Sequence, residues 1–228
     1  MKLSAIILTK DESDFLLKPC LESVYSLADE IIIVDSNGKD SLEIQKWFGE
    51  DKKIKCFVKK WLDSYSYTDS RNFGIEQATG DWTLHLDADE VLGEKKYKIR
   101  DCINRNEADA VSLVGHHFMY NLSLEDATLE RHIWRNRLTR KISYPKGTMH
   151  GLPQGQREEI IEEPIIFHFG YVKGIYKYMR DKWRTEKVRW EMHSPEQYRK
   201  YILDVLNGKY PVKPFMEELP IEIERDLI

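Results

Sequence analysis

Short apolar runs alternate with segments of helical periodicity along the first part of the chain. Four runs rich in apolar and β-branched residues predict strands: 3–8, 30–35, 54–58 and 82–86. Three segments between them predict helices: 15–27, 41–48 and 69–78. Pro19 indicates that the first helix begins near it or kinks there. This β-α-β-α-β-α-β order predicts an α/β fold, a mainly parallel sheet with helices on both faces.

The second half of the chain is less regular. Three further strands are expected: 110–120, 131–138 and 165–169. The stretch 143–155 is rich in Gly and Pro and predicts a loop, whereas 175–191 and 195–206 predict helices. We therefore expect one domain over residues 1–172 and a helical C-terminal extension over 173–228.

Composition narrows the class of protein. The 228 residues are 41% hydrophobic and 32% charged, and the formal net charge is −4. This balance gives no electrostatic basis for general nucleic-acid binding. Three cysteines without CxxC spacing argue against a disulfide framework and against a cysteine zinc site. No apolar stretch reaches the roughly 18 residues of a spanning helix or resembles a signal peptide, so we expect a cytoplasmic protein.

Polar residues cluster where the predicted strands end. Thr9-Lys10-Asp11-Glu12 follows the first strand, Asp35-Ser36 the second, and Asp87-Ala88-Asp89 the fourth. Ligands of parallel α/β sheets bind at the carboxyl ends of the strands. Residues two apart in a strand point to the same side, so Asp87 and Asp89 can face one site. Paired carboxylates favour a hard divalent cation such as Mg²⁺ or Mn²⁺.

A single Asp-x-Asp is common by chance as an acidic turn, so its place in the chain matters. Phosphatases with an aspartyl nucleophile carry this motif after their first strand, whereas here it follows the fourth. No GxGxxG follows the first strand, and no GxxxxGK[ST] occurs in the sequence. Dinucleotide oxidoreductases and P-loop NTPases therefore lack their main signatures.

Several motifs together resemble family 2 glycosyltransferases. Five segments carry the likeness, in the order of that family: 4–12 (SAIILTKDE), 21–24 (LESV), 28–36 (ADEIIIVDS), 71–74 (RNFG) and 80–90 (GDWTLHLDADE). The match is specific over about residues 3–92. Within the family, the sequence most resembles the small bacterial enzymes that add glucose or heptose to lipopolysaccharide cores. The resemblance implies a GT-A fold over residues 1–172, a nucleotide-sugar donor, a divalent cation and inverting transfer.

The resemblance also implies which side chains would bind the nucleotide sugar. Thr9 and Glu12 would line the base pocket, and Asp35 would bond the base or the ribose. Arg71 would approach the diphosphate, for which a permanently charged, forked donor is suited. The alternative for Arg71 is a salt bridge on the helix surface. Asp87 would contact the ribose or the sugar.

A metal site follows from the same resemblance. Asp89 would bind a cation, Mn²⁺ or Mg²⁺, that bridges both phosphates, and Glu90 is expected to be structural. The segment IIFHFGY (165–171) resembles the late histidine segment of the family, so His168 is the second expected metal ligand. An imidazole beside a carboxylate suits Mn²⁺. The alternative is a buried strand histidine between two phenylalanines.

Three positions depart from the family pattern. Asp11 replaces a usual asparagine, and Gly38 replaces the serine of Asp-x-x-Ser-x-Asp. Gly151 stands where close relatives often carry a glutamate that is suited to contact the acceptor or to act as the base. The sequence therefore leaves the catalytic base unsettled.

An inverting transfer needs a carboxylate or an imidazole near the attacking hydroxyl. His150 is the first candidate, because it lies in the Gly- and Pro-rich loop after the main sheet. Glu158 is a candidate catalytic residue with it, and His116 and Asp126 are alternatives.

The favoured function is a metal-dependent, inverting glycosyltransferase that moves a hexosyl group from a nucleotide sugar, foremost a UDP-sugar, to a saccharide or glycolipid acceptor. A nucleotidyltransferase is one alternative, although its first loop is typically glycine-rich and basic, unlike residues 9–13. A catalytically silent nucleotide-binding module is the other, because of Gly151. The basic predicted helix at 175–191 is either solvated or in contact with the inner face of a membrane.

Overall fold

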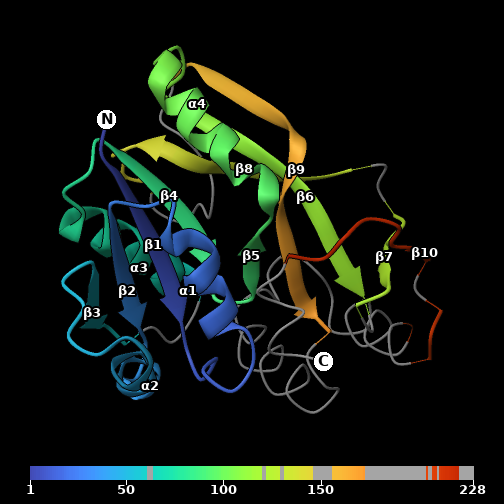
Figure 1. The fold of residues 1–228 in the computed structure, drawn as a ribbon, viewed down its shortest axis with the longest axis horizontal. Helices are drawn as coiled ribbons and strands as arrows, with labels where there is room; N and C mark the ends of the chain where they lie inside the picture. Colours follow the sequence, from blue (N-terminus) through green and yellow to red (C-terminus); the bar gives the residue numbers. More distant parts are fainter. Residues whose placement is uncertain are drawn as a thin grey trace.

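The computed structural model describes most of the chain. The described residues are 1–60, 64–119, 122–128, 131–145, 156–172, 204, 207–209 and 211–220. The first four strands have nearly the predicted bounds: β1 (Leu3–Thr9), β2 (Glu30–Asp35), β3 (Ile54–Val58) and β4 (Trp82–Asp87). They run parallel in the order β4-β1-β2-β3 (Figure 1).

Helices cover both faces of these parallel strands. Three of them alternate with the strands: α1 (Leu17–Tyr25), α2 (Lys39–Phe48) and α3 (Ser64–Gln77). Leu21 of α1 shares one apolar core with Ile7, whereas Ile75 of α3 shares another with Ile6. Neighbouring strand residues point to opposite faces, so α1 and α3 lie on opposite sides of the sheet. The predicted α/β fold is confirmed.

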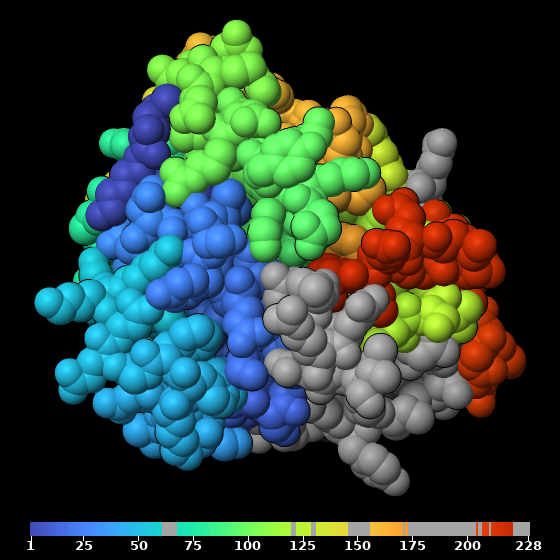
Figure 2. Space-filling model, viewed as in Figure 1, coloured from blue at the N-terminus to red at the C-terminus, as the bar shows by residue number. Residues whose placement is uncertain are grey.

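The second half of the sheet is mostly antiparallel. Its strands are β5 (Glu90–Leu92), β6 (Ala110–Met119), β7 (Leu124–Asp126), β8 (His132–Arg140), β9 (Glu158–Tyr171) and β10 (Val212–Pro214). β8 lies antiparallel between β4 and β6, and β9 runs parallel to β6 while pairing with β5. In Figure 2, the red segment that contains β10 lies against the yellow-green residues of β7, its partner. The predicted parallel arrangement therefore holds for β1–β4, and in the second half β6 and β9 also pair in parallel.

Several elements of this half were not predicted. β5, β7 and β10 are short, and the helix α4 (Tyr97–Arg105) follows a single 3-10 turn, η1 (Glu94–Lys96). β9 begins at Glu158, seven residues before the strand expected at 165. β10 also places a strand within the extension that was expected to be helical. The two helices predicted there lie outside the described residues, apart from Asp204.

No helix within the described part of the chain is both long enough and apolar enough to cross a bilayer.

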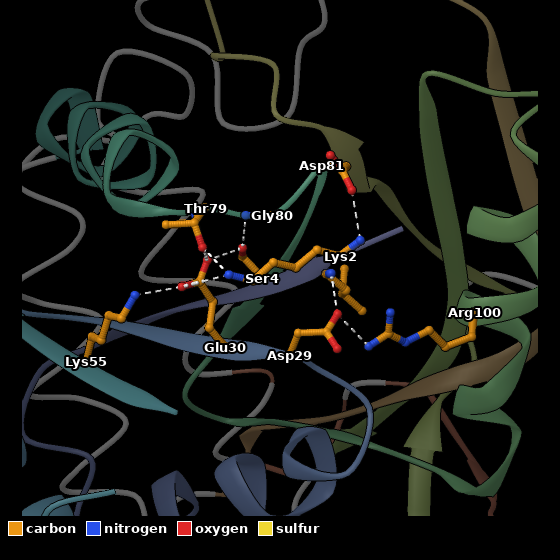
Figure 3. A network of polar contacts seen from close by, with 10 residues as sticks. Lys2, Ser4, Asp29, Glu30, Lys55, Thr79, Gly80, Asp81 and Arg100 are labelled. Atoms are coloured by element: carbon orange, nitrogen blue, oxygen red, sulfur yellow. Dashed lines mark hydrogen bonds and ion pairs between the residues drawn. The ribbon is translucent and has the colours of Figure 1, made fainter. Parts of the chain in front are cut away.

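A network of polar contacts closes the edge of the sheet where β1 and β2 begin (Figure 3). The Glu30 carboxylate accepts hydrogen bonds from Ser4 Oγ (2.6 Å), from the Thr79 backbone N–H (2.5 Å) and from Lys55 Nζ (2.8 Å). Gly80 donates its N–H to Ser4 Oγ (2.8 Å), and a Cβ at Gly80 would lie 2.5 Å from that oxygen. The network therefore fixes how the end of α3 connects to β4.

The pKa of Glu30 reports the strength of this network. Burial by itself raises the pKa, but the bonds from Lys55, Ser4 and Thr79 outweigh it and lower the pKa to about 2. A carboxyl whose folded pKa lies below its unfolded value stabilises the fold above the unfolded pKa and loses this contribution as the pH falls towards the folded value.

We predict that Glu30→Gln lowers the free energy of unfolding at pH 7 by roughly 2–3 kcal/mol, since one pKa unit corresponds to about 1.4 kcal/mol. The difference between the wild type and the variant should shrink as the pH falls from about 5 to 2. Urea unfolding at several pH values measures this. The exposed Glu50→Gln should match the wild type throughout, and a pH-independent deficit of Glu30→Gln would contradict the linkage.

Candidate active site

The polar ends of three strands meet, as the sequence predicts. In the sheet register Thr9 lies beside Asp35, and Leu8 lies beside Asp87. β1 lies between β2 and β4, so the first loop is flanked by the two acidic strand ends. The candidate site is therefore at the carboxyl edge of β1, β2 and β4, opposite the edge held by Glu30.

Asp40, in the first turn of α2, holds the loop after β1. Its buried carboxylate accepts hydrogen bonds from Thr9 Oγ1 (2.5 Å) and from the backbone N–H groups of Glu12 and Ser13 (both 3.0 Å). Asp11 in this loop has a φ of 57°. Asn and Asp both adopt this left-handed conformation more readily than most residues. Asp11 can therefore replace the family's usual asparagine without a change in backbone conformation. Asp40 was not predicted as a site residue.

Asp35 caps the same helix from the end of β2. One carboxylate oxygen accepts the Asn37 N–H (3.0 Å), and the other accepts the N–H and the hydroxyl of Ser41 (both 2.8 Å). Gly38, between them, has a φ of 81° and a prospective Cβ 3.3 Å from Val58. The departure from serine at Gly38 therefore follows from a backbone conformation that only glycine adopts freely.

Asp87, at the end of β4, lies between two buried guanidinium groups. Arg71 Nη2 is 2.8 Å from one of its oxygens, and Arg137 Nη2 is 3.0 Å from the other. The Arg71 and Arg137 side chains are 1% and 3% exposed, whereas that of Asp87 is 21% exposed. Arg71 is thus no helix-surface salt bridge. Its charge and that of Arg137 keep Asp87 ionised and fix its direction.

Glu90 completes this buried charge cluster. Its carboxylate accepts a bond from Arg137 Nη2 (2.6 Å) and one from the Asp87 backbone N–H (2.8 Å). Burial raises the pKa of Glu90, Arg137 opposes this, and the neighbouring Asp87 raises it again, so the net direction is upward. Glu90 fixes both the turn and the arginine, which is the structural role expected from the sequence.

A bulge in β8 aims Arg137 at the cluster. Val111 pairs with Leu138, yet Leu113 pairs with Trp134, so three residues of β8 lie opposite one of β6. Asn136, in the middle of the bulge, has a φ of 52°. Its carbonyl accepts the Tyr144 hydroxyl (2.8 Å). Bulges commonly redirect a side chain beside an active site. The Arg-Asn-Arg sequence within a strand pattern was the only signal of this bulge, and sequence reasoning missed it.

Asp89 and His168 form the second half of the site. The Asp89 carboxylate is 3.7 Å from His168 Nε2, and both side chains are 17% exposed. β5 brings them together, because Glu90 pairs with His168 and the Phe169 N–H bonds the Asp89 carbonyl (2.9 Å). His168 Nδ1 is 3.2 Å from His117 Nδ1. When His168 Nδ1 carries the proton of this bond, its Nε2 presents a lone pair on the side of Asp89.

These residues fit a cation that arrives with a phosphorylated substrate. Within the described residues no group of three or more His, Cys, Asp or Glu side chains could hold a metal ion. Mg²⁺ and similar ions are commonly bound by one or two carboxylates together with substrate phosphates and water. Gly170 lets both side chains lie close to the backbone of β9, because a Cβ there would lie 2.8 Å from His168 Nε2 and 2.9 Å from Asp89 Oδ2.

Among the candidate catalytic bases, Glu158 lies apart from this turn, His116 and Asp126 have partners on other strands, and His150 lies outside the described residues. Glu158 is exposed at the start of β9, ten residues from His168, which is roughly 30 Å along a strand. The structure therefore does not bring Glu158 into the site. His116 bonds Glu125 (2.8 Å) and packs on phenylalanines. Asp126 is buried and lies 3.5 Å from His132 Nε2. His150 and Gly151 lie outside the described residues.

The family model for glycosyl transferase family 2 matches residues 4–163, and the chain belongs to this family. An uncharacterized glycosyltransferase of Rickettsia bellii is 36% identical over 94 residues, which are 41% of this chain and 30% of that protein. A TPR repeat-containing protein of Synechococcus elongatus is 28% identical over 222 residues, 91% of this chain and 52% of that protein. The chain thus spans between about a third and a half of these relatives.

A crystal structure of S. aureus TarS residues 1–349 in complex with UDP-GlcNAc has a similar fold. Its TM-score to this chain is 0.53 at 16% sequence identity, and the match covers 73% of this chain and 58% of that one. This likeness supports the GT-A fold implied by the sequence.

We predict that Arg137→Met lowers the free energy of unfolding by about 3–5 kcal/mol, because it leaves Asp87 and Glu90 without their shared buried cation. The exposed Arg135→Met on the same strand should change it by less than about 0.5 kcal/mol. Urea unfolding followed by circular dichroism measures both. Equal losses for the two variants would show that the cluster is not held as described.

Proposed function

We propose that this chain is a metal-dependent, inverting glycosyltransferase. It transfers a hexosyl group from a UDP-sugar to a hydroxyl of a saccharide or glycolipid acceptor. The observation that carries the proposal is the arrangement at the end of β4: Asp87 held by two arginines, and Asp89 facing His168 over Gly170. Membership in glycosyl transferase family 2 supports the reaction class. TarS, which has the same fold, is bound to UDP-GlcNAc in its crystal structure, and this supports a UDP-linked donor.

The first loop and the end of β2 would bind the nucleoside. Thr9, Glu12 and Asp35 all lie at this edge, and Asp40 and Ser41 hold the loop and the Asp35 carboxylate in place. Preorganised polar groups reduce the entropy that binding must overcome. We assign the base and ribose to this side because β2 lies on the far side of β1 from the acidic turn.

Asp87 would accept hydrogen bonds from hydroxyls of the ribose or the sugar. Each of its oxygens accepts an arginine, and its side chain is 21% exposed, so the carboxylate is both fixed in direction and reachable from solvent. Arg71 and Arg137 act through Asp87, as positioning residues, rather than on the diphosphate that Arg71 was expected to approach. A carboxylate fixed on two sides orients the sugar ring for attack.

Asp89 and His168 would hold the cation, Mn²⁺ or Mg²⁺. A bound cation neutralises the charge that develops on the departing diphosphate. His117 would orient the His168 ring through the contact between their Nδ1 atoms, and Gly170 lets His168 and Asp89 approach each other.

Inversion requires attack from the face of the sugar opposite the leaving diphosphate. The acceptor oxygen forms a bond to the anomeric carbon, the bond from that carbon to the phosphate oxygen breaks, and nucleoside diphosphate leaves. The acceptor hydroxyl proton passes to a base on the acceptor side. His150 remains the predicted base.

We predict that UDP with Mn²⁺ raises the melting temperature by about 5 °C or more, since ligand at 100 times its Kd adds about 2.7 kcal/mol to stability. Asp89→Asn should remove the metal-dependent part of the shift and leave the shift with UDP alone. Differential scanning fluorimetry with UDP, GDP, CDP and dTDP measures this.

A matched control is Asp81→Asn, at the opposite end of β4. Asp81 accepts the Lys2 N–H (2.8 Å), which an asparagine amide can also do, so this variant should keep the full metal-dependent shift. No shift with any of the four nucleotides would count against the proposed function. Release of pyrophosphate from a nucleoside triphosphate and a sugar phosphate would favour a nucleotidyltransferase instead.

We also predict that transfer from an α-linked UDP-sugar yields a β-glycoside, because the acceptor attacks opposite the diphosphate. Proton NMR of the product reports the anomeric coupling directly. A product with retained α configuration would exclude the single-displacement mechanism while leaving the transferase assignment intact.

A further inference from the structure

A continuous group of aromatic rings lies next to the Asp89–His168 pair. His117, His132 and Trp134, here called the aromatic platform, pack ring against ring: His117 lies 5.2 Å from His132 and 6.2 Å from Trp134 between ring centroids. His168 joins the platform to the candidate metal site, with its ring centroid 4.5 Å from that of His117 and 6.0 Å from that of Trp134.

Strand register places these rings on one face of the sheet. His132 and Trp134 are two residues apart in β8 and pair with Gly115 and Leu113 of β6, while His117 of β6 pairs with His168 of β9. Residues at even spacing along a strand share a face. Trp134 packs against the main core, which holds the platform in place. Trp134, His117 and His132 are all only partly buried, so the platform is accessible in part from the surface.

We propose that the aromatic platform is the acceptor subsite and that it binds a neutral pyranose ring. This inference rests on the proposed function, because it assigns the second substrate of the same reaction. The position of the platform supports it. In the strand order β2-β1-β4-β8-β6, the nucleoside side is at β2, the acidic turn follows β4, and the platform lies on β8 and β6 beyond it. The platform therefore lies on the other side of the acidic turn from the proposed nucleoside site.

The chemistry of the platform matches a sugar ring. The apolar C–H face of a pyranose packs on an aromatic face, and the hydroxyls at its rim need polar partners. The Trp134 indole and the nearly parallel His117 ring, 23° apart, provide the aromatic rings of this subsite.

Charge favours a neutral ring over an anionic one. The Asp126 carboxylate lies 3.5 Å from His132 Nε2, and Asp89 lies 3.7 Å from His168. The negative charge of Asp126 beside the platform disfavours a phosphate or an acidic sugar at that end. The acceptor residue is therefore a hexose or a similar uncharged sugar.

The test measures binding of methyl α- and β-D-glucopyranoside and methyl β-D-galactopyranoside by saturation-transfer NMR, with UDP and Mg²⁺ present and absent. Trp134→Leu keeps apolar volume over the core and removes the aromatic face. We expect it to weaken glycoside binding about tenfold, which corresponds to about 1.4 kcal/mol, with UDP binding unchanged. Trp134→Phe should retain part of the affinity.

Trp47→Leu is the matched control, since Trp47 of α2 is likewise partly buried against the main core. It should bind glycosides as the wild type does. Equal binding by Trp134→Leu and the wild type overturns the proposal, as does the absence of glycoside binding in a wild type that binds UDP. Glycoside binding that depends on Trp134 in a protein that fails to bind any nucleotide supports the platform and refutes the proposed function.

Discussion

The ion pairs between Asp87 and two buried guanidinium groups are the constraint on which the rest of the site depends. Moving such charges out of water costs several kcal/mol for each ion, and only close, well-directed partners offset that cost. Arg71 comes from α3, Asp87 from β4 and Arg137 from β8, so the pairs form only when these three elements are in their native register. The position of the acidic turn is therefore as well defined as the packing of the sheet itself.

The carboxyl edge and the opposite edge of the same strands use charge differently. Glu30 at the start of β2 is bonded by neutral donors and by a lysine, and its low pKa shows that the ionised form is stabilised. Glu90 beside the acidic turn has a raised pKa, because burial and neighbouring carboxylates disfavour its charge. One edge thus gains stability from its carboxylate. At the carboxyl edge, the ionised form of Glu90 is disfavoured, and such shifted pKa values are common where proteins bind cations or transfer protons.

Sequence reasoning located β1, β2 and β4 well because both faces of these strands are buried, which produces continuous apolar runs. It failed for β5, β7 and β10, which are too short for any periodicity, and for the first part of β9, where glutamates hide the pattern. In the site, Asp35, Asp87 and Asp89 were singled out because each lies at the end of a strand or just after it. Arg137 was missed because its place depends on a bulge and on pairing with a residue fifty positions away. Asp40 was missed because its partners are backbone groups of another loop.

The two carboxylates of the Asp-x-Asp motif differ in their surroundings, although their spacing alone suggests a matched pair. Asp87 is neutralised by two arginines, so a cation placed directly on it would compete with fixed positive charge. Asp89 has a histidine beside it, so its surroundings suit a divalent ion better than those of Asp87. Residues two apart at the end of a strand face the same side, so Asp87 and Asp89 lie at one edge. The arginines of α3 and β8 and the histidine of β9 then give the two carboxylates different surroundings. Under the proposed function, Asp87 would orient substrate hydroxyls, and Asp89 would hold the cation beside the leaving diphosphate.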